Sequence, residues 1–209
     1  MPFTADGNWF DFRDDGFDDR RPALFLDRDG VVIEERHYIQ HPHDVVLIEG
    51  SIRALKPFVL EGFRLILVSN QAGIGRGILS WDDVFAVQQR LRDLWHQNDL
   101  VWDMALLCPH HPEHGQGQYL QDNPWRKPHP GMFEFAASTM PLDLTRSIMV
   151  GDRLADLQAA HAAGVAKLVH VLSGHGESER GAVQSWSKSK NVRMIDSIAE
   201  LTTSPERPS

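Results

Sequence analysis

Cysteine is almost absent from this chain of 209 residues, because Cys108 is the only one. A single cysteine excludes an intrachain disulfide, so nothing in the sequence calls for an oxidising compartment. Long hydrophobic runs are missing as well, and no stretch approaches the roughly 20 apolar residues that span a bilayer. The first residues also lack the basic and then apolar pattern of a secretory signal. We therefore expect a cytoplasmic protein without a membrane partner.

Positive charge is scarce too. Lys and Arg number 21 against 29 Asp and Glu, and the formal net charge is −8. Nucleic-acid binding needs clustered Lys and Arg that replace phosphate counterions, so this balance argues against a nucleic-acid partner. With 42% hydrophobic and 24% charged residues, the composition is that of a globular protein able to bury a core.

Residues 1–22 form an acidic segment, with six Asp against three Arg and no apolar periodicity. We expect a solvated N-terminal arm, pinned to the body at most by Trp9, Phe10 and Phe12. Residues 23–203 are predicted to form a single domain, and residues 204–209 a polar tail.

Short apolar runs alternate with amphipathic segments along residues 23–203. The runs are predicted as buried strands at 23–27, 64–70, 104–109, 147–152, 165–171 and, more weakly, 192–195. Helices are expected to be capped by Ser51 and Ser80, to open at Pro130, and to cover 154–164 and 197–202. This alternation predicts an α/β fold, a Rossmann-like doubly wound parallel sheet with helices on both faces. Ligands of such folds bind outside the carboxyl ends of the strands.

Polar side chains follow four of the predicted strands. They are Asp27 and Asp29 after the first, Ser69 and Asn70 at the end of the second, Lys127 after the third, and Asp152 with Asp156 after the fourth. Two acids one residue apart at a strand end repel each other unless a cation or a proton intervenes. Carboxylates suit Mg²⁺, and a lysine with a hydroxyl suits a phosphoryl group. The set favours phosphoryl transfer to an Asp carboxylate, giving an aspartyl-phosphate that water cleaves.

The order D-x-D-G, S-N, Lys and G-D-x-x-x-D resembles that of the haloacid dehalogenase superfamily of phosphatases. More closely, the chain is similar to the D-glycero-D-manno-heptose-1,7-bisphosphate 7-phosphatases and their histidinol-phosphate phosphatase relatives. The stretches that carry this likeness are FLDRDGVV, VSNQAGIGRG, CPHHP, RKPHPGM and VGDRLADLQAAHAAG, within about residues 22–172. The resemblance implies a haloacid dehalogenase fold and a Mg²⁺-dependent phosphatase of a small phosphorylated metabolite.

The resemblance also implies roles for the matching residues. Asp27 would be the nucleophile, and Asp29 would protonate the leaving oxygen and then activate water. Mg²⁺ would be held by the side chains of Asp27 and Asp152 and by the backbone carbonyl of Asp29. Ser69 and Lys127 would grip the transferring phosphoryl group.

Asp156 has two interpretations. It would orient Lys127 or metal-bound waters, or it is only a helix N-terminal acid favoured by the helix dipole.

The intervals between the motifs leave no room for a separate cap domain. Those from Asp29 to Ser69 and from Ser69 to Lys127 are already filled by predicted elements. The site must therefore be closed by loops 31–49, 71–79 and 109–126. Candidate substrate-binding residues in or beside these loops are Glu35, His37, Tyr38, Asn70, Gln71, Arg76 and Arg126. The guanidinium of Arg126 suits a second phosphate or sugar hydroxyls.

The loop at 108–126 departs from the family pattern. In the resembling phosphatases it binds structural Zn²⁺ through Cys-x-His followed by Cys-x-Cys just before Arg-Lys-Pro. Here Cys108 and His110 keep the first pair, but Asn123 and Trp125 replace the second and are not zinc ligands. We expect a degenerate site without zinc, in which Trp125 anchors the loop by packing. The alternative is a rebuilt site that recruits His111, His114 or His129 with Asp122.

Other functions stay open. Histidinol-phosphate phosphatases share almost all the motifs, whereas a nucleic-acid 3′-phosphatase conflicts with the acidic balance. A non-catalytic sugar-phosphate binder on the same fold would not need the intact Asp27, Asp29, Lys127 and Asp152. We expect a monomer or a small homo-oligomer.

Overall fold

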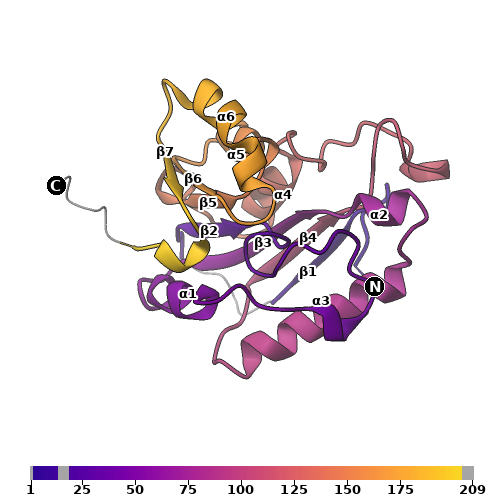
Figure 1. Cartoon of the computed structure of the whole chain (residues 1–209), viewed down its shortest axis with the longest axis horizontal. Coiled ribbons are helices and arrows are strands. Elements are labelled where there is room, and N and C mark those ends of the chain that lie inside the picture. The colour runs from indigo at the N-terminus through magenta and orange to yellow at the C-terminus, as the bar shows by residue number, and fades with distance from the viewer. Residues whose placement is uncertain (1, 14–18, 204–209) are drawn as a thin grey trace.

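The protein is built on one twisted sheet, seen in a computed structural model that describes residues 2–13 and 19–203 (Figure 1). The strands are β1 (Trp9–Phe12), β2 (Ala23–Leu26), β3 (Arg64–Asn70), β4 (Met104–Cys108), β5 (Ile148–Gly151), β6 (Lys167–Val171) and β7 (Val192–Ile195). Their order is β1-β4-β3-β2-β5-β6-β7. β1 runs antiparallel to β4, and the other neighbouring pairs are parallel. The predicted α/β fold with a parallel sheet is confirmed.

Helices cover both faces of the sheet. α1 (Ser51–Leu60) and α3 (Trp81–His96) lie on one face, and α4 (Gly131–Thr139), α5 (Leu154–Ala162) and α6 (Gly176–Ser187) on the other (Figure 1). Shorter elements are α2 (Ala72–Gly75), η1 (Pro42–Asp44), η2 (Gly117–Tyr119), η3 (Leu144–Arg146) and η4 (Ile198–Glu200). None of the helices within residues 2–13 and 19–203 has the length and hydrophobicity of a membrane-spanning helix.

Successive residues of the central strand β2 pack into two separate hydrophobic cores, one on each face of the sheet. Leu24 and Leu26 pack with Phe58 of α1, whereas Phe25 between them packs with Phe133 of α4 on the opposite face. The ring centroids of Phe25 and Phe133 lie 4.8 Å apart. A central strand buried on both faces needs apolar residues throughout, which explains the unbroken apolar run that predicted it.

Several predicted boundaries need correction. α1 begins at Ser51, but the capping position is Gly50, with φ of 79°, so Ser51 is not the cap. The helix expected at 197–202 is the single 3-10 turn Ile198–Glu200. α6 was not predicted, because it buries only Gly176 and Val183 and so lacks a clear apolar stripe. The predicted cap at Ser80 is confirmed at the start of α3, where Ser80 forms a capping box with Asp83.

Residues 9–12 belong to the sheet rather than to a solvated arm. They form β1, whose partners in β4 run from Leu107 opposite Trp9 to Met104 opposite Phe12. Trp9 is buried against α3, with its ring centroid 5.6 Å from that of Phe85. The sequence did not predict this strand, because its few apolar residues stand among many Asp residues. Residues 14–18 and the tail at 204–209 lie outside the described residues.

The strand order reverses between β2 and β5. β3 and β4 continue the sheet on one side of β2, and β5, β6 and β7 on the other. A crevice is expected outside the carboxyl ends of strands at such a reversal. Asp27 and Asp152 are the first residues after β2 and β5. No insertion large enough for a cap domain separates the elements of residues 19–203.

Candidate active site

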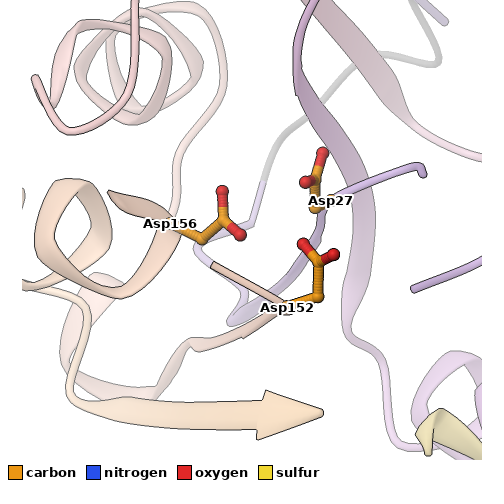
Figure 2. Close-up of side chains that lie close together, drawn as sticks. All are labelled: Asp27, Asp152 and Asp156. Carbon is orange, nitrogen blue, oxygen red and sulfur yellow. The ribbon is translucent and has the colours of Figure 1, made fainter. Parts of the chain in front are cut away.

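Three carboxylates converge at the strand reversal (Figure 2). Asp27 follows β2, Asp152 follows β5, and Asp156 lies in the first turn of α5. One oxygen of each lies within 4.8 Å of the others, and all three residues are buried. Two neighbouring parallel strands and one helix start therefore create the acidic cluster.

Lys127 joins this cluster from the loop after β4. Its Nζ lies 3.1 Å from Asp27 Oδ1 and 2.7 Å from Asp156 Oδ1, and it donates to the Val68 carbonyl at 2.8 Å. Asn70 at the end of β3 fixes the Lys127 backbone, because its Oδ1 accepts from Lys127 N at 3.1 Å and its Nδ2 donates to Lys127 O at 3.0 Å. The lysine is thus held at both its backbone and its ammonium group.

Asp156 fits both of its interpretations. Its Oδ1 pairs with Lys127, while its Oδ2 accepts from Arg153 N at 2.9 Å at the start of α5.

Burial and like charges shape the protonation of the cluster. Burial raises the pKa of Asp27 to about 7, although the Lys127 ammonium lowers it. Burial likewise raises the pKa of Asp152 to about 8, with Asp156 and Asp27 adding to the rise. Burial alone would lower the pKa of Lys127, but Asp156 and Asp27 outweigh it and raise this pKa. One lysine does not balance three acids, so the cluster favours a cation.

Asp152 has the features of a Mg²⁺ ligand. Its Oδ2 accepts from His175 N at 2.7 Å, whereas its buried Oδ1 has no hydrogen-bond partner among the described residues. Gly30 (φ 79°) and Gly174 (φ 59°) lie against it, and a Cβ on either would come within 2.5 or 2.4 Å of Oδ2. Converging carboxylate oxygens around an unpaired acceptor fit Mg²⁺, which prefers hard oxygen ligands.

Asp29 is held by two side chains beside the cluster. Arg28 pairs with it through both Nε and Nη2, and Nη2 lies 2.9 Å from Oδ2. Gln71 Nε2 donates to Asp29 Oδ2 at 2.9 Å and to Ser69 Oγ at 2.9 Å. Gln88 of α3 accepts from Arg28 Nη1 at 3.1 Å and so fixes the buried guanidinium.

Arg28 and Gln88 were not predicted as site residues. Arg28 stands inside the D-x-D motif, which was a usable signal. Gln88 is buried beside the apolar stripe of α3. A polar residue at a position of α3 that the helical pattern buries is the sequence signal that could have identified it.

A cavity of about 400 Å³ opens onto Asp27, Asp29, Ser69 and Lys127. All seven predicted substrate-binding residues line it: Glu35, His37, Tyr38, Asn70, Gln71, Arg76 and Arg126. Arg76 Nη1 donates to the Tyr38 hydroxyl at 2.8 Å, which joins two of the predicted closing loops.

His111, Arg153 and His175 also line the cavity and were not predicted as cavity residues; His111 was considered only as a zinc ligand. His175 follows β6, so it too stands near a strand end, and its Nε2 lies 3.7 Å from Glu35 Oε2. The glycine-flanked stretch SGHG after β6 was the signal for it.

The loop at 108–126 does not bring together four zinc ligands. Cys108 is fully buried, and burial raises the pKa of its thiol to about 12. His110 Nδ1 shares a hydrogen bond with Gln121 Nε2 at 3.0 Å. Trp125 packs on Phe135 with ring centroids 4.7 Å apart, as expected of an anchor.

Two histidines of the alternative site have hydrogen-bond partners, and one of these partners is the candidate ligand Asp122 itself. His129 Nε2 pairs with Asp122 Oδ1 at 2.8 Å, and His111 Nδ1 accepts from the backbone amides of Glu113 and His114. Within residues 2–13 and 19–203, the one group of three or more side chains placed to hold a metal is Asp27, Asp152 and Asp156.

The chain matches known protein sequences over most of its length. A family profile described as HAD-hydrolase-like matches residues 124–201. The D-glycero-beta-D-manno-heptose-1,7-bisphosphate 7-phosphatase of Vibrio cholerae is 40% identical over 181 residues, which cover 87% of this chain and 94% of that protein. The D-glycero-alpha-D-manno-heptose-1,7-bisphosphate 7-phosphatase of Burkholderia mallei is 40% identical over 143 residues, 68% of this chain and 76% of that protein.

Solved structures agree with the sequence matches. A putative HAD-like phosphatase from Mesorhizobium loti has a TM-score of 0.77 at 37% identity, covering 81% of this chain and 82% of that one. The D,D-heptose 1,7-bisphosphate phosphatase from B. bronchiseptica, complexed with magnesium and phosphate, has a TM-score of 0.73 at 28% identity, covering 85% and 94%. The chain therefore belongs to the D-glycero-D-manno-heptose-1,7-bisphosphate 7-phosphatase family of the haloacid dehalogenase-like hydrolases, and it is a phosphatase.

Proposed function

We propose that the protein removes the 7-phosphate of D-glycero-D-manno-heptose 1,7-bisphosphate, in a Mg²⁺-dependent reaction that passes through an aspartyl-phosphate on Asp27. The observation that carries the proposal is the environment of Asp27. Its Oδ1 accepts from Arg28 N at 2.8 Å and lies 3.1 Å from Lys127 Nζ, so Oδ2 is the oxygen left to attack phosphorus. The side chain borders the cavity, where a phosphate can reach it.

The first step moves the phosphoryl group onto the protein. Asp27 Oδ2 attacks phosphorus, the bond from phosphorus to the sugar oxygen breaks, and the leaving oxygen takes a proton from Asp29. Lys127 offsets charge on the transferring group. Ser69 Oγ already accepts from Gln71 Nε2, so its hydrogen is available to donate to a phosphoryl oxygen.

The second step restores the enzyme. Asp29, now a carboxylate, takes a proton from water while the water oxygen attacks phosphorus and the bond to Asp27 Oδ2 breaks. The Arg28 guanidinium stabilises this carboxylate, and Gln71 fixes its orientation. Inorganic phosphate leaves, and Asp27 and Asp29 return to their starting states.

Asp27 and Asp152 would hold Mg²⁺ with the backbone carbonyl of Asp29, and Asp156 lies in the same cluster while pairing with Lys127. When bound, Mg²⁺ supplies positive charge that offsets the charge of the phosphoryl group.

The cavity suits a substrate with a second phosphate. Arg76, Arg126 and Arg153 line it, so beside Lys127 it offers further positive charge for a second anionic group. Relatives at 40% identity are named for the beta and for the alpha anomer, so both are candidate substrates.

A phosphate-release screen tests the proposal. The substrates are both anomers of the heptose 1,7-bisphosphate, the 1-phosphate and 7-phosphate alone, and histidinol phosphate, each with Mg²⁺ and after chelation. We expect a heptose bisphosphate to give the highest kcat/KM, with the 1-phosphate retained in the product. A higher kcat/KM for histidinol phosphate, or full activity after chelation, would contradict the proposal.

A further inference from the structure

The N-terminal arm reaches the loop that carries Arg126. β1 lies along β4 as far as Leu107, and β4 enters the loop at Cys108. Before β1 the chain makes a tight turn, in which Asn8 N donates to Thr4 Oγ1 at 3.0 Å and Gly7 has φ of 85°. This turn brings Asp6 and Asn8 against the far end of the loop.

Asp6 and Asn8 both bond to the Asn123 side chain. Asn123 Nδ2 donates to Asp6 Oδ2 at 2.6 Å, and Asn8 Nδ2 donates to Asn123 Oδ1 at 3.2 Å. Asn8 and Asn123 are 0% and 1% exposed. A buried amide that loses its hydrogen-bond partner is destabilising, because the free energy of removing it from water is no longer offset. These contacts therefore strongly favour one position of the loop.

The arm also contacts Trp125 through a shared ring. Phe10 of β1 packs on Phe135 of α4 with ring centroids 5.0 Å apart, and Trp125 packs on the same ring at 4.7 Å. The arm thus bonds directly to position 123 and shares a packing partner with position 125, the two positions where the family pattern has the second pair of zinc ligands.

Asn123 in turn fixes the segment that leads to Arg126. Its Oδ1 accepts from Trp125 N at 2.9 Å, and its carbonyl accepts from Arg126 N at 2.9 Å. Arg126 Nη1 donates to the His110 carbonyl at 2.8 Å, at the other end of the loop. The guanidinium that lines the cavity is therefore set by contacts that begin in the arm.

We propose that Asp6, Asn8 and Phe10 are positioning residues, which clamp Asn123 and Trp125 and so hold Arg126 at the substrate. In this chain the clamp makes the cross-link that a zinc ion would make between the two ends of the loop. The role of Arg126 toward substrate rests on the proposed function, whereas the clamp itself does not.

Asp6→Ala is the first test, because Asp6 is exposed and its loss leaves the core intact. Hydrogen exchange followed by mass spectrometry should speed up at residues 109–126 and stay unchanged in β5 and β6. KM for the heptose bisphosphate should rise roughly tenfold, about the effect of one lost hydrogen bond to a charged group, with kcat within about twofold. Asp6→Asn should restore both readouts, since its amide oxygen still accepts from Asn123.

Two controls separate the clamp from general effects. Asp19→Ala removes another acid of the arm, one that pairs with Arg21 and Arg64 and not with the loop, and should change neither readout. Asn123→Ala should change both readouts at least as much as Asp6→Ala, because it also removes the bonds to Asn8 and Trp125. The double variant should then add little to Asn123→Ala, because the contact with Asp6 is already lost.

Hydrogen exchange tests the clamp, and KM tests the positioning of Arg126, so the two parts of the proposal can fail separately. Unchanged exchange at 109–126 in both Asp6→Ala and Asn123→Ala would overturn the clamp, whatever the enzyme's substrate is. Faster exchange with no rise in KM would overturn the positioning of Arg126. About one zinc per chain, found by elemental analysis of protein purified without metal affinity, would also overturn the proposal, because zinc would then hold the loop.

Discussion

The acidic cluster and the loop at 108–126 border the same cavity but are held in place by different means. The cluster stands on buried strands: Asp27 and Asp152 are the residues that directly follow β2 and β5. The loop depends instead on side chains far away in sequence, such as Asp6, which bonds to Asn123. The sheet therefore fixes the groups proposed for chemistry, while the arm fixes a group proposed for substrate binding. Changes in the two regions should then have different consequences.

Asp27→Asn should give the largest effect, a loss of kcat of at least about 10³-fold, because an amide does not attack phosphorus. The fold should survive, since Lys127 keeps its pair with Asp156 at 2.7 Å. Phosphate release and thermal melting of the purified variant measure the two effects. Substantial turnover by the folded variant would show that another residue is the nucleophile.

Lys127→Met should remove activity and also destabilise the protein. Lys127 is buried between Asp27 and Asp156, and removing one partner of a buried ion pair costs about 3–5 kcal/mol. Urea unfolding at pH 8 measures the loss, and saturating Mg²⁺ should recover part of it by replacing the positive charge. A stability equal to that of Asp27→Asn would mean that Lys127 does not balance the acids.

The residues of the acidic cluster could be predicted from the sequence, because each is marked by residues close to it in the chain. Asp27 and Asp152 directly follow apolar strands, Lys127 stands in the short motif RKP at the end of the loop after β4, and the structure brings the three together. The packing of Trp9 and Phe10 against the body was predicted, but the strand β1 was missed, because both residues stand in an Asp-rich segment without apolar periodicity. The pairing of Asp6 with Asn123 joins residues that are 117 positions apart, and neither residue type is unusual at a loop. Such a contact depends on the folded sheet and leaves no local pattern.

Mg²⁺ should stabilise the protein more as the pH rises. The pKa values of Asp27 and Asp152 are raised to about 7 and about 8, above the 3.8 of a free Asp. The folded, metal-free protein therefore binds more protons than the unfolded chain between about pH 4 and 8, and its stability falls as the pH rises through that window. Mg²⁺ competes with those protons, so the shift in Tm caused by Mg²⁺ should be larger at pH 7.5 than at pH 5.5. The same shift in an Asp152→Asn variant, or no change with pH, would contradict the proposed metal site.

Gln88→Leu should have a smaller effect on turnover. Gln88 accepts from Arg28 Nη1 at 3.1 Å, and Arg28 pairs with Asp29, so the change loosens the acid–base group without touching substrate. We expect kcat to fall roughly five- to tenfold, as for one lost hydrogen bond to a charged group, with KM nearly unchanged. Gln89→Leu is the matched control, because Gln89 lies next to it on α3 but bonds to the exposed Asp93. Equal kinetics of the two variants would show that Gln88 does not position Asp29 through Arg28.

Cys108→Ser should give the smallest effect. It tests whether the Cys108 side chain stabilises the protein by packing or by binding zinc. Cys108 is fully buried, and its thiol, with a pKa of about 12, behaves as a small apolar group. A hydroxyl in its place costs about 1–3 kcal/mol of unfolding free energy when it finds no partner, and Cys108→Ala should cost a similar amount through lost packing. Because neither change touches the bonds that the arm makes to Asn123, KM and kcat should stay within about twofold of the original protein. If the thiol were instead a zinc ligand, the serine variant would lose bound zinc, speed up hydrogen exchange at 109–126 and raise KM, whereas a packing residue changes only the unfolding free energy.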